Sequence, residues 1–161
     1  MRNTRLFLIT VLASVLIGYT PQVTASDGNS IVYGLTLEPS GFDPHIHRSS
    51  ELGIVLRQVY DTLVYVDPDT KTFVPGLATD WVIAEDGLSY TFTLREDVVF
   101  HDGTPFDAEA VAANLDRITN PETLSQQAVY MLGSYDHYEV IDAYTIRLVL
   151  YEAYAPLLDS L

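Results

Sequence analysis

Residues 77–95, LATDWVIAEDGLSYTFTLR, contain the pattern that decides the fold of this 161-residue chain. In the second half of this stretch, apolar side chains at positions 88, 90, 92 and 94 alternate with polar ones. This alternation is typical of a strand with one buried face, and an Asp-Gly pair before such a strand is a strong hairpin signal. The stretch therefore predicts a β-hairpin that turns at Asp86-Gly87. Residues 76–81, just before it, fit a short helical turn.

Three further extended segments or pairs are predicted on either side of this hairpin. Residues 138–141 and 145–150 are rich in β-branched and aromatic residues and flank a short turn, which predicts a second hairpin. Upstream, residues 63–66 and 71–75 flank a turn whose Pro68 presets the backbone angle. The earliest predicted strand covers residues 30–37 and is ended by a loop that begins at Glu38-Pro39.

Helices are expected between these strands. One should begin at Ser49 or Ser50 and present a single apolar face, formed by Leu52, Val55, Leu56, Val59 and Leu63. A second should be capped by Asp107 and stopped by Asn120-Pro121, and a weaker helical pattern covers residues 124–132. The fold class is thus α/β mixed (α+β), with antiparallel hairpins and short helices.

The first 25 residues are predicted to be a secretory signal peptide. Arg2 and Arg5 give a basic start, an apolar run follows, and small residues precede a cleavage site between Ala25 and Ser26. An uncleaved membrane anchor is the alternative, but the run is shorter than the ~20 apolar residues that span a bilayer. The chain has no cysteine and therefore no lipid-modified cysteine. A soluble periplasmic protein that is not a lipoprotein is expected.

The charge of the chain narrows its possible partners. With 8 basic and 22 acidic residues, its formal net charge is −14. A surface of this sign repels nucleic-acid phosphates and anionic lipid heads. We therefore expect no nucleic-acid partner and, after signal cleavage, no direct insertion into a membrane.

Two histidines raise an alternative function. His45 and His47 lie two positions apart after a predicted strand, a spacing with which two imidazoles can bind one ion, so a periplasmic metal-dependent hydrolase is conceivable. A catalytic metal site needs a third protein ligand, and no third ligand is evident nearby in the sequence. His101-Asp102 lies in a glycine-proline turn, where an aspartate commonly bonds its own backbone. Trp81, beside an apolar run, is expected to be a core or subdomain-contact residue.

Residues 77–95 and their continuation through residues 98–111, VVFHDGTPFDAEAV, strongly resemble the bacterial extracellular solute-binding proteins for peptides and nickel. Glu38-Pro39 with Asp43-Pro44, residues 59–64 and residues 153–161 are similar to further segments of that family. The resemblance covers residues 30–161, whereas family members run to several times this length. It therefore implies the N-terminal portion of a two-lobed periplasmic binding protein fold.

The resemblance also implies a function and a domain division. Residues 26–48 would form the first strand and loop of the first lobe, and residues 49–161 its smaller subdomain, truncated at the C-terminus. The protein would be a component of an ATP-driven (ABC) importer that binds a peptide or peptide-like solute by closure of two lobes. It would work as a monomer with the permease subunits and would have neither a cofactor nor a catalytic activity.

Three positions of the chain match residues that contact ligand in nickel-binding relatives. They are His47, Leu52 and Tyr130. His47 stands where those relatives have an aromatic residue, which leaves the identity of the solute open among peptides, nickel chelates, sugars and opines.

Overall fold

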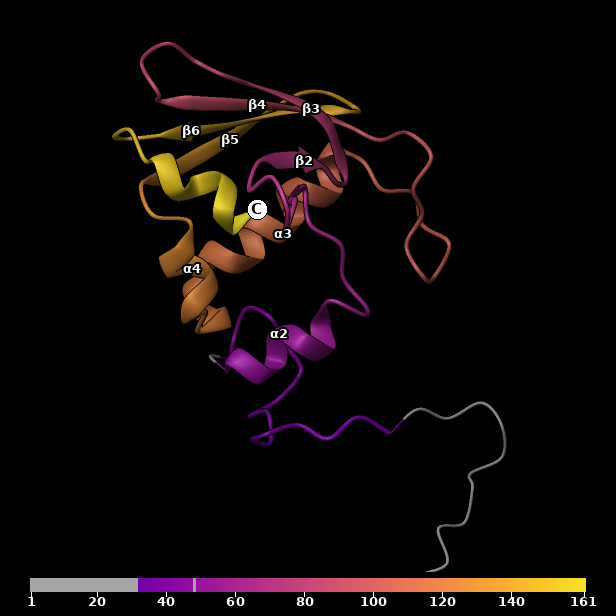
Figure 1. The fold of residues 1–161 in the computed structure, drawn as a ribbon. Coiled ribbons are helices and arrows are strands. Elements are labelled where there is room, and N and C mark those ends of the chain that lie inside the picture. Colours follow the sequence, from indigo (N-terminus) through magenta and orange to yellow (C-terminus); the bar gives the residue numbers. More distant parts are fainter. Residues whose placement is uncertain (1–31, 48) are drawn as a thin grey trace, which may run out of the picture. The chain divides into compact units, whose positions relative to one another are not determined.

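A computed structural model describes residues 32–47 and 49–161 of the chain (Figure 1). The predicted signal peptide and the first two residues of the predicted first strand lie outside the described residues. The chain divides into two units, residues 1–34 and 35–161, and every described helix and strand belongs to the second unit.

Two antiparallel hairpins join to form a four-stranded sheet in the order β3-β4-β6-β5. Its strands are β3 (Ala78–Ile83), β4 (Ser89–Leu94), β5 (Tyr135–Asp142) and β6 (Thr145–Leu150). The two central strands, β4 and β6, come from different hairpins and pair with each other, so that Phe92 lies opposite Ile146. Both hairpins that the sequence predicts are confirmed.

The core lies on one face of this sheet. Alternate side chains of the two central strands are buried on that face: Tyr90, Phe92, Leu94, Ile146, Leu148 and Leu150. Helix α3 (Ala108–Thr119) contributes an apolar stripe to the same cluster: Val111, Ala112, Leu115 and Ile118. Each large apolar side chain contributes about 1.5–3 kcal/mol through burial, so the contact between sheet and helix dominates the stability of the unit.

Helix α3 begins and ends where the sequence predicts. The carboxylate of Asp107 accepts a hydrogen bond from the backbone N–H of Ala110 at 2.9 Å, which satisfies one of the free amides of the first turn. At the other end, Asn120 adopts an extended backbone before Pro121, which opens the 3-10 turn η1 (Pro121–Thr123). Helix α3 therefore presents one defined polar face beside its buried stripe.

Smaller elements lie on the same side of the sheet as α3 (Figure 1). They are α2 (Ser50–Leu56), the hairpin of β1 (Val64–Val66) and β2 (Phe73–Pro75), α4 (Gln127–Met131) and the 3-10 turn η2 (Ala155–Ser160). The β1–β2 pair confirms the strand pair predicted around Pro68. Among the described residues, no helix has both the length and the apolar character needed to cross a bilayer.

Four of the expected elements differ from the structure. Residues 78–81 form part of strand β3 and not a helical turn, because pairing with β4 supplies hydrogen bonds that a short isolated turn lacks. Residues 32–37 form no strand, because no described strand pairs with them, and Val32 is 93% exposed. Helix α2 ends at Leu56, leaving Val59 exposed, and α4 is shorter than the predicted 124–132.

Candidate ligand-binding site

The loop of residues 42–47 is shaped by Asp43. Its carboxylate oxygen Oδ1 accepts hydrogen bonds from the backbone N–H groups of His45 at 2.9 Å and Ile46 at 3.4 Å. Its carbonyl oxygen accepts a third, from the N–H of His47 at 3.2 Å. An aspartate that bonds the backbone two residues ahead is a recurrent way to close a turn, and Pro44 restricts the chain further. The loop therefore has a defined conformation before any ligand arrives.

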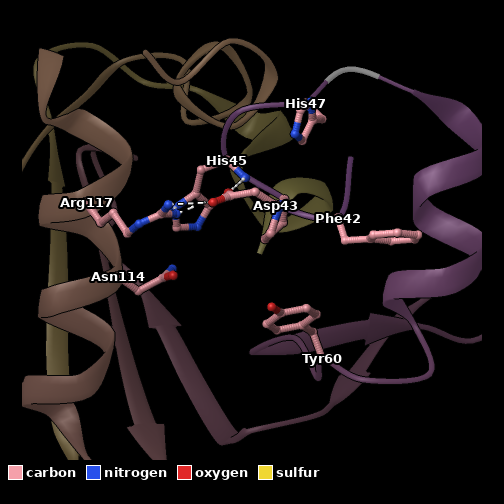
Figure 2. A pocket seen from close by; sticks show the side chains of 8 residues that line it. Phe42, Asp43, His45, His47, Tyr60, Asn114 and Arg117 are labelled. Carbon is pink, nitrogen blue, oxygen red and sulfur yellow. Dashed lines mark hydrogen bonds and ion pairs between the residues drawn. The ribbon is translucent and has the colours of Figure 1, made fainter. Parts of the chain in front are cut away.

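Arg117, on the polar face of α3, binds this loop (Figure 2). Its guanidinium donates to both carboxylate oxygens of Asp43, with distances of 2.5 Å to Oδ2 and 3.2 Å to Oδ1. The same guanidinium lies 2.6 Å from Nδ1 of His45. Paired hydrogen bonds between a guanidinium and a carboxylate fix orientation as well as distance. One side chain of α3 thus contacts two residues of the loop.

These contacts set the charges of the site. The hydrogen bond from Arg117 is the main reason why the pKa of Asp43 is lowered from 3.8 to about 2. Burial, followed by the positive charge of Arg117, lowers the pKa of His45 below 6.5. At neutral pH the site therefore holds a carboxylate, a guanidinium and a neutral imidazole. Because Nδ1 of His45 accepts from Arg117, the imidazole proton resides on Nε2.

A cavity of about 530 Å³ lies between this loop, α3 and the segment that follows α2. The residues that line it are Phe42, Asp43, Pro44, His45, His47, Tyr60, Asn114 and Arg117. Figure 2 shows the hydroxyl of Tyr60 and the amide of Asn114 directed into the open space. The positive charge of Arg117 is already balanced by Asp43, and Phe42, Tyr60 and Asn114 add aromatic and hydrogen-bonding groups without charge.

The three predicted contact residues occupy different environments. His47 lines the cavity and its Nδ1 lies 3.2 Å from the hydroxyl of Ser40. Tyr130, on α4, is 80% exposed and lines a separate hollow of about 340 Å³. Leu52 is buried on α2 and lines neither the cavity nor the hollow beside Tyr130. The structure does not bring the three side chains together around one cavity.

The second hollow is aromatic and acidic. Besides Tyr130 it is lined by Tyr151, Tyr154 and Glu152, whose carboxylate accepts a hydrogen bond from Ser134 at 3.2 Å. The ring of Tyr154 lies against Gly133, where an added Cβ would approach within 2.4 Å of it. Only a glycine leaves room for this ring, so the backbone itself forms part of the wall.

The loop and the beginning of α4 are joined through His45. The carbonyl oxygen of His45 accepts hydrogen bonds from the hydroxyl of Ser125 at 3.1 Å and from the N–H of Gln126 at 3.2 Å. The hydroxyl of Ser125 in turn accepts from the N–H of Val129 at 3.2 Å. The segment that holds His47 and the helix that holds Tyr130 are therefore connected by hydrogen bonds, although the two side chains line different hollows.

The geometry does not favour the metal-hydrolase alternative. The imidazoles of His45 and His47 have different partners, Arg117 and Ser40, and a guanidinium beside an imidazole repels a metal cation. Among the described residues, no group of three or more histidine, aspartate or glutamate side chains could hold a metal ion. The carboxylate of Asp102 accepts from the N–H and the hydroxyl of Thr104, which confirms the turn role predicted for it.

Sequence reasoning missed Arg117, Asn114, Tyr60 and Phe42 as parts of the site. Asn114 and Arg117 are three positions apart on α3, a spacing that places both on one helical face, beside the buried stripe. That spacing could have indicated a polar face on the predicted helix, but no local pattern in the sequence shows that this face contacts Asp43. Trp81 packs against the core cluster, in agreement with its predicted role.

A concave cavity in which a few polar groups converge is the kind of place where proteins bind small molecules. Comparison with known proteins identifies the class of protein. The family model of bacterial extracellular solute-binding proteins, family 5 (middle part), matches residues 72–161, more than half of the chain. The chain belongs to this family.

Individual relatives agree with the family match. A glutathione-binding protein, GsiB, of Salmonella paratyphi A is 32% identical over 151 residues, which cover 93% of this chain and 28% of the relative. NikA from Brucella suis, solved in complex with Fe(III)-EDTA, is 34% identical with a TM-score of 0.67, covering 78% of this chain and 25% of that structure.

A peptide complex is also similar. DppA from Helicobacter pylori, solved with the peptide STSA, is 31% identical with a TM-score of 0.65, covering 75% of this chain and 27% of that structure. The chain thus spans little more than a quarter of the length of these relatives. The fold class and the family predicted from residues 77–111 are confirmed.

Proposed function

We propose that this chain is part of the extracytoplasmic solute-binding component of an ABC importer, and that its solute is a peptide or a peptide-like molecule. The observation that carries the proposal is the family match over residues 72–161. In this mechanism the protein makes and breaks no bonds in its solute; two lobes close over the solute, and the permease subunits recognise the closed form.

The chemistry of the cavity favours a peptide-like solute. Because Asp43 neutralises Arg117, the cavity offers no free charge of either sign from this pair. The hydroxyl of Tyr60 can both donate and accept, which suits the alternating N–H and C=O groups of a peptide backbone. The amide of Asn114 also lines the cavity and already has one partner, His45. A strongly charged solute would find less here to balance its charge.

The site residues follow from the same proposal. His47 and Tyr130 would contact the solute with their side chains, each from its own hollow. Leu52 is 4% exposed, so its proposed contact with the solute requires lobe closure to uncover its side chain. The division of the first lobe at residues 48 and 49 and the monomeric state belong to this proposal as well.

Calorimetric titration of the protein, purified as its gene encodes it, would test the proposed function. The probes are glutathione, the peptide Ser-Thr-Ser-Ala and nickel with L-histidine. We expect saturable binding of at least one peptide probe, and a loss of affinity of about tenfold in each of the variants His47→Ala and Tyr130→Ala.

Two matched variants serve as controls. His137→Ala removes an exposed histidine from β5, and Tyr65→Ala removes an exposed tyrosine from β1; neither residue lines a hollow. Their affinities should equal that of the parent protein. Binding of the nickel complex alone would contradict the proposed solute class, and failure to bind any probe would contradict the function.

Export can be tested separately. We propose that residues 1–25 are removed and that the mature protein begins at Ser26 in the periplasm. Mass spectrometry of the protein from the periplasmic fraction should give the mass expected for a chain that starts at Ser26. An intact Met1 in the membrane fraction would instead indicate a retained anchor.

A further inference from the structure

We infer that Arg117 is a positioning residue, which holds both the His47 loop and the beginning of α4 in the arrangement that binds solute. The inference rests on the proposed function for what the two segments bind. The part of the inference that concerns the order of the two segments rests on contacts within the protein.

The first step is the number of contacts that converge on the loop. The guanidinium of Arg117 donates to both carboxylate oxygens of Asp43 and lies 2.6 Å from Nδ1 of His45. Asp43 uses oxygen Oδ1 to accept from the backbone N–H of His45 as well. Arg117 therefore binds the group that closes the turn, and not only a side chain on its surface.

The second step is the place of Arg117 in the fold. It lies in the last turn of α3, one residue before the buried Ile118. Helix α3 packs on the four-stranded sheet through five buried residues, so the backbone at Arg117 is held by the core through the neighbouring Ile118. The loop, in contrast, is mostly irregular and contributes only His45 to the buried residues of segment 42–47.

The third step is the connection to α4. The side chain of His45 accepts a hydrogen bond from the guanidinium of Arg117. The carbonyl oxygen of His45 accepts hydrogen bonds from the hydroxyl of Ser125 and the N–H of Gln126. Displacement of His45 would break both sets of contacts at once. Helix α4 has only five residues, too few to be stable alone, so its position depends on such tertiary contacts.

The consequence is a division of roles. His47 lies in a turn closed by Asp43 and Tyr130 lies on a five-residue helix. Arg117 ties the turn to α3 directly and ties the helix to α3 through His45. Restricting a binding segment before the solute arrives lowers the entropy lost on binding. Arg117 would thereby raise affinity by ordering the two segments.

The test combines amide hydrogen exchange with calorimetric titration of Arg117→Met, in the protein purified as its gene encodes it. Methionine keeps much of the aliphatic length of the side chain and removes the guanidinium. We expect exchange at the amides of His45 and His47 to accelerate about tenfold or more, with smaller acceleration at Val129. Amides of β4 should exchange as in the parent protein. The affinity for the best of the three probes should fall by about tenfold.

Two variants separate this role from a general loss of stability. Arg147→Met removes an arginine of similar exposure that pairs with Glu139 on the opposite face of the sheet, and it should change neither loop exchange nor affinity. Ser125→Ala removes one contact of His45 with α4, and it should accelerate exchange at Val129 while leaving His47 unchanged.

Each result decides a stated part of the inference. Unchanged exchange at His45 and His47 in Arg117→Met would show that Arg117 does not order the loop. Faster exchange with unchanged affinity would show that loop order does not serve binding. If the parent protein binds none of the probes, the proposed function fails and the binding half of the inference fails with it, whereas the exchange result still decides whether Arg117 orders the segments.

Discussion

Arg117 and Asp43 are 74 residues apart in the sequence, yet their side chains form a two-point ion pair. The side chain of Arg117 is 45% exposed and that of Asp43 is 30% exposed, so water screens part of their attraction. Pairs of this kind contribute about 1 kcal/mol or less to global stability. The pair therefore matters more for the local order of the loop than for the free energy of unfolding of the whole unit.

Acid should destabilise the protein in two separable steps. The folded-state pKa of His45 is below its unfolded value of 6.5, so its contribution is complete above pH 6.5 and is lost as the pH falls below it. The pKa of Asp43 is about 2 when folded and 3.8 when unfolded, so its contribution is lost between about pH 4 and pH 2. Urea unfolding from pH 8 to pH 2 would measure both.

Two variants identify these groups among the other acids of the chain. The difference in unfolding free energy between His45→Gln and the parent should narrow as the pH falls below 6.5. The corresponding difference for Asp43→Asn should stay constant above pH 4 and shrink below it. Differences that do not vary with pH would contradict the assigned pKa shifts.

Because neighbouring residues of β4 lie on opposite faces of the sheet, their alanine substitutions should differ strongly in the loss of unfolding free energy. Phe92 is 0% exposed and Tyr90 is 4% exposed, so replacing either with alanine should cost about 3–5 kcal/mol of unfolding free energy. Thr91 lies on the other face of the strand, and Thr91→Ala should cost less than about 1 kcal/mol. Equal losses in chemical denaturation of the three variants would show that the facing is wrong.

Alanine substitutions at two glycines with positive φ allow the cost of backbone strain to be distinguished from the cost of a steric clash. Gly133 has φ +59 and its Cβ would meet the ring of Tyr154, whereas Gly103 has φ +87 with open space around it. Gly103→Ala should cost about 1–2 kcal/mol through strain alone. Gly133→Ala should cost about 1–3 kcal/mol more, because the ring must move. Thermal unfolding would compare them, and equal losses would mean that Tyr154 moves aside freely.

Zinc provides a direct test of the histidine pair. After dialysis, elemental analysis should find less than one zinc per chain, because Nδ1 of His45 already faces a guanidinium and the described residues offer no three-ligand group. One firmly bound zinc per chain, lost in His47→Ala together with a hydrolytic activity, would instead favour the hydrolase.

Local patterns carried most of the fold prediction. The alternation over residues 90–94, the cap at Asp107 and the break at Asn120-Pro121 each involve neighbours in sequence, and the structure has all three. Leu88, predicted on the buried face, instead precedes β4 and is exposed. The helical turn expected at residues 76–81 was wrong because the strand there depends on pairing with β4. The helical preference of six residues is small, and the hydrogen bonds that pair β3 with β4 outweigh it.

The site was harder to predict for the same physical reason. Its contacts join Asp43 and His45 to Arg117 and Ser125, more than 70 residues further along the chain. No spacing rule relates such positions, and only the packing of α3 brings them close. His47 was identified through the resemblance to a family, and its role as a solute contact stays a prediction.

The order of the strands also has a consequence for synthesis. Thr91 on β4 and Arg147 on β6 are partners 56 residues apart, and β6 separates β4 from β5 in the sheet. While the ribosome is still adding those residues, the inner edge of β4 has hydrogen-bonding groups with no strand to meet them. An open edge of this kind can pair with other chains, so an incomplete chain that lacks β6 would be prone to aggregation.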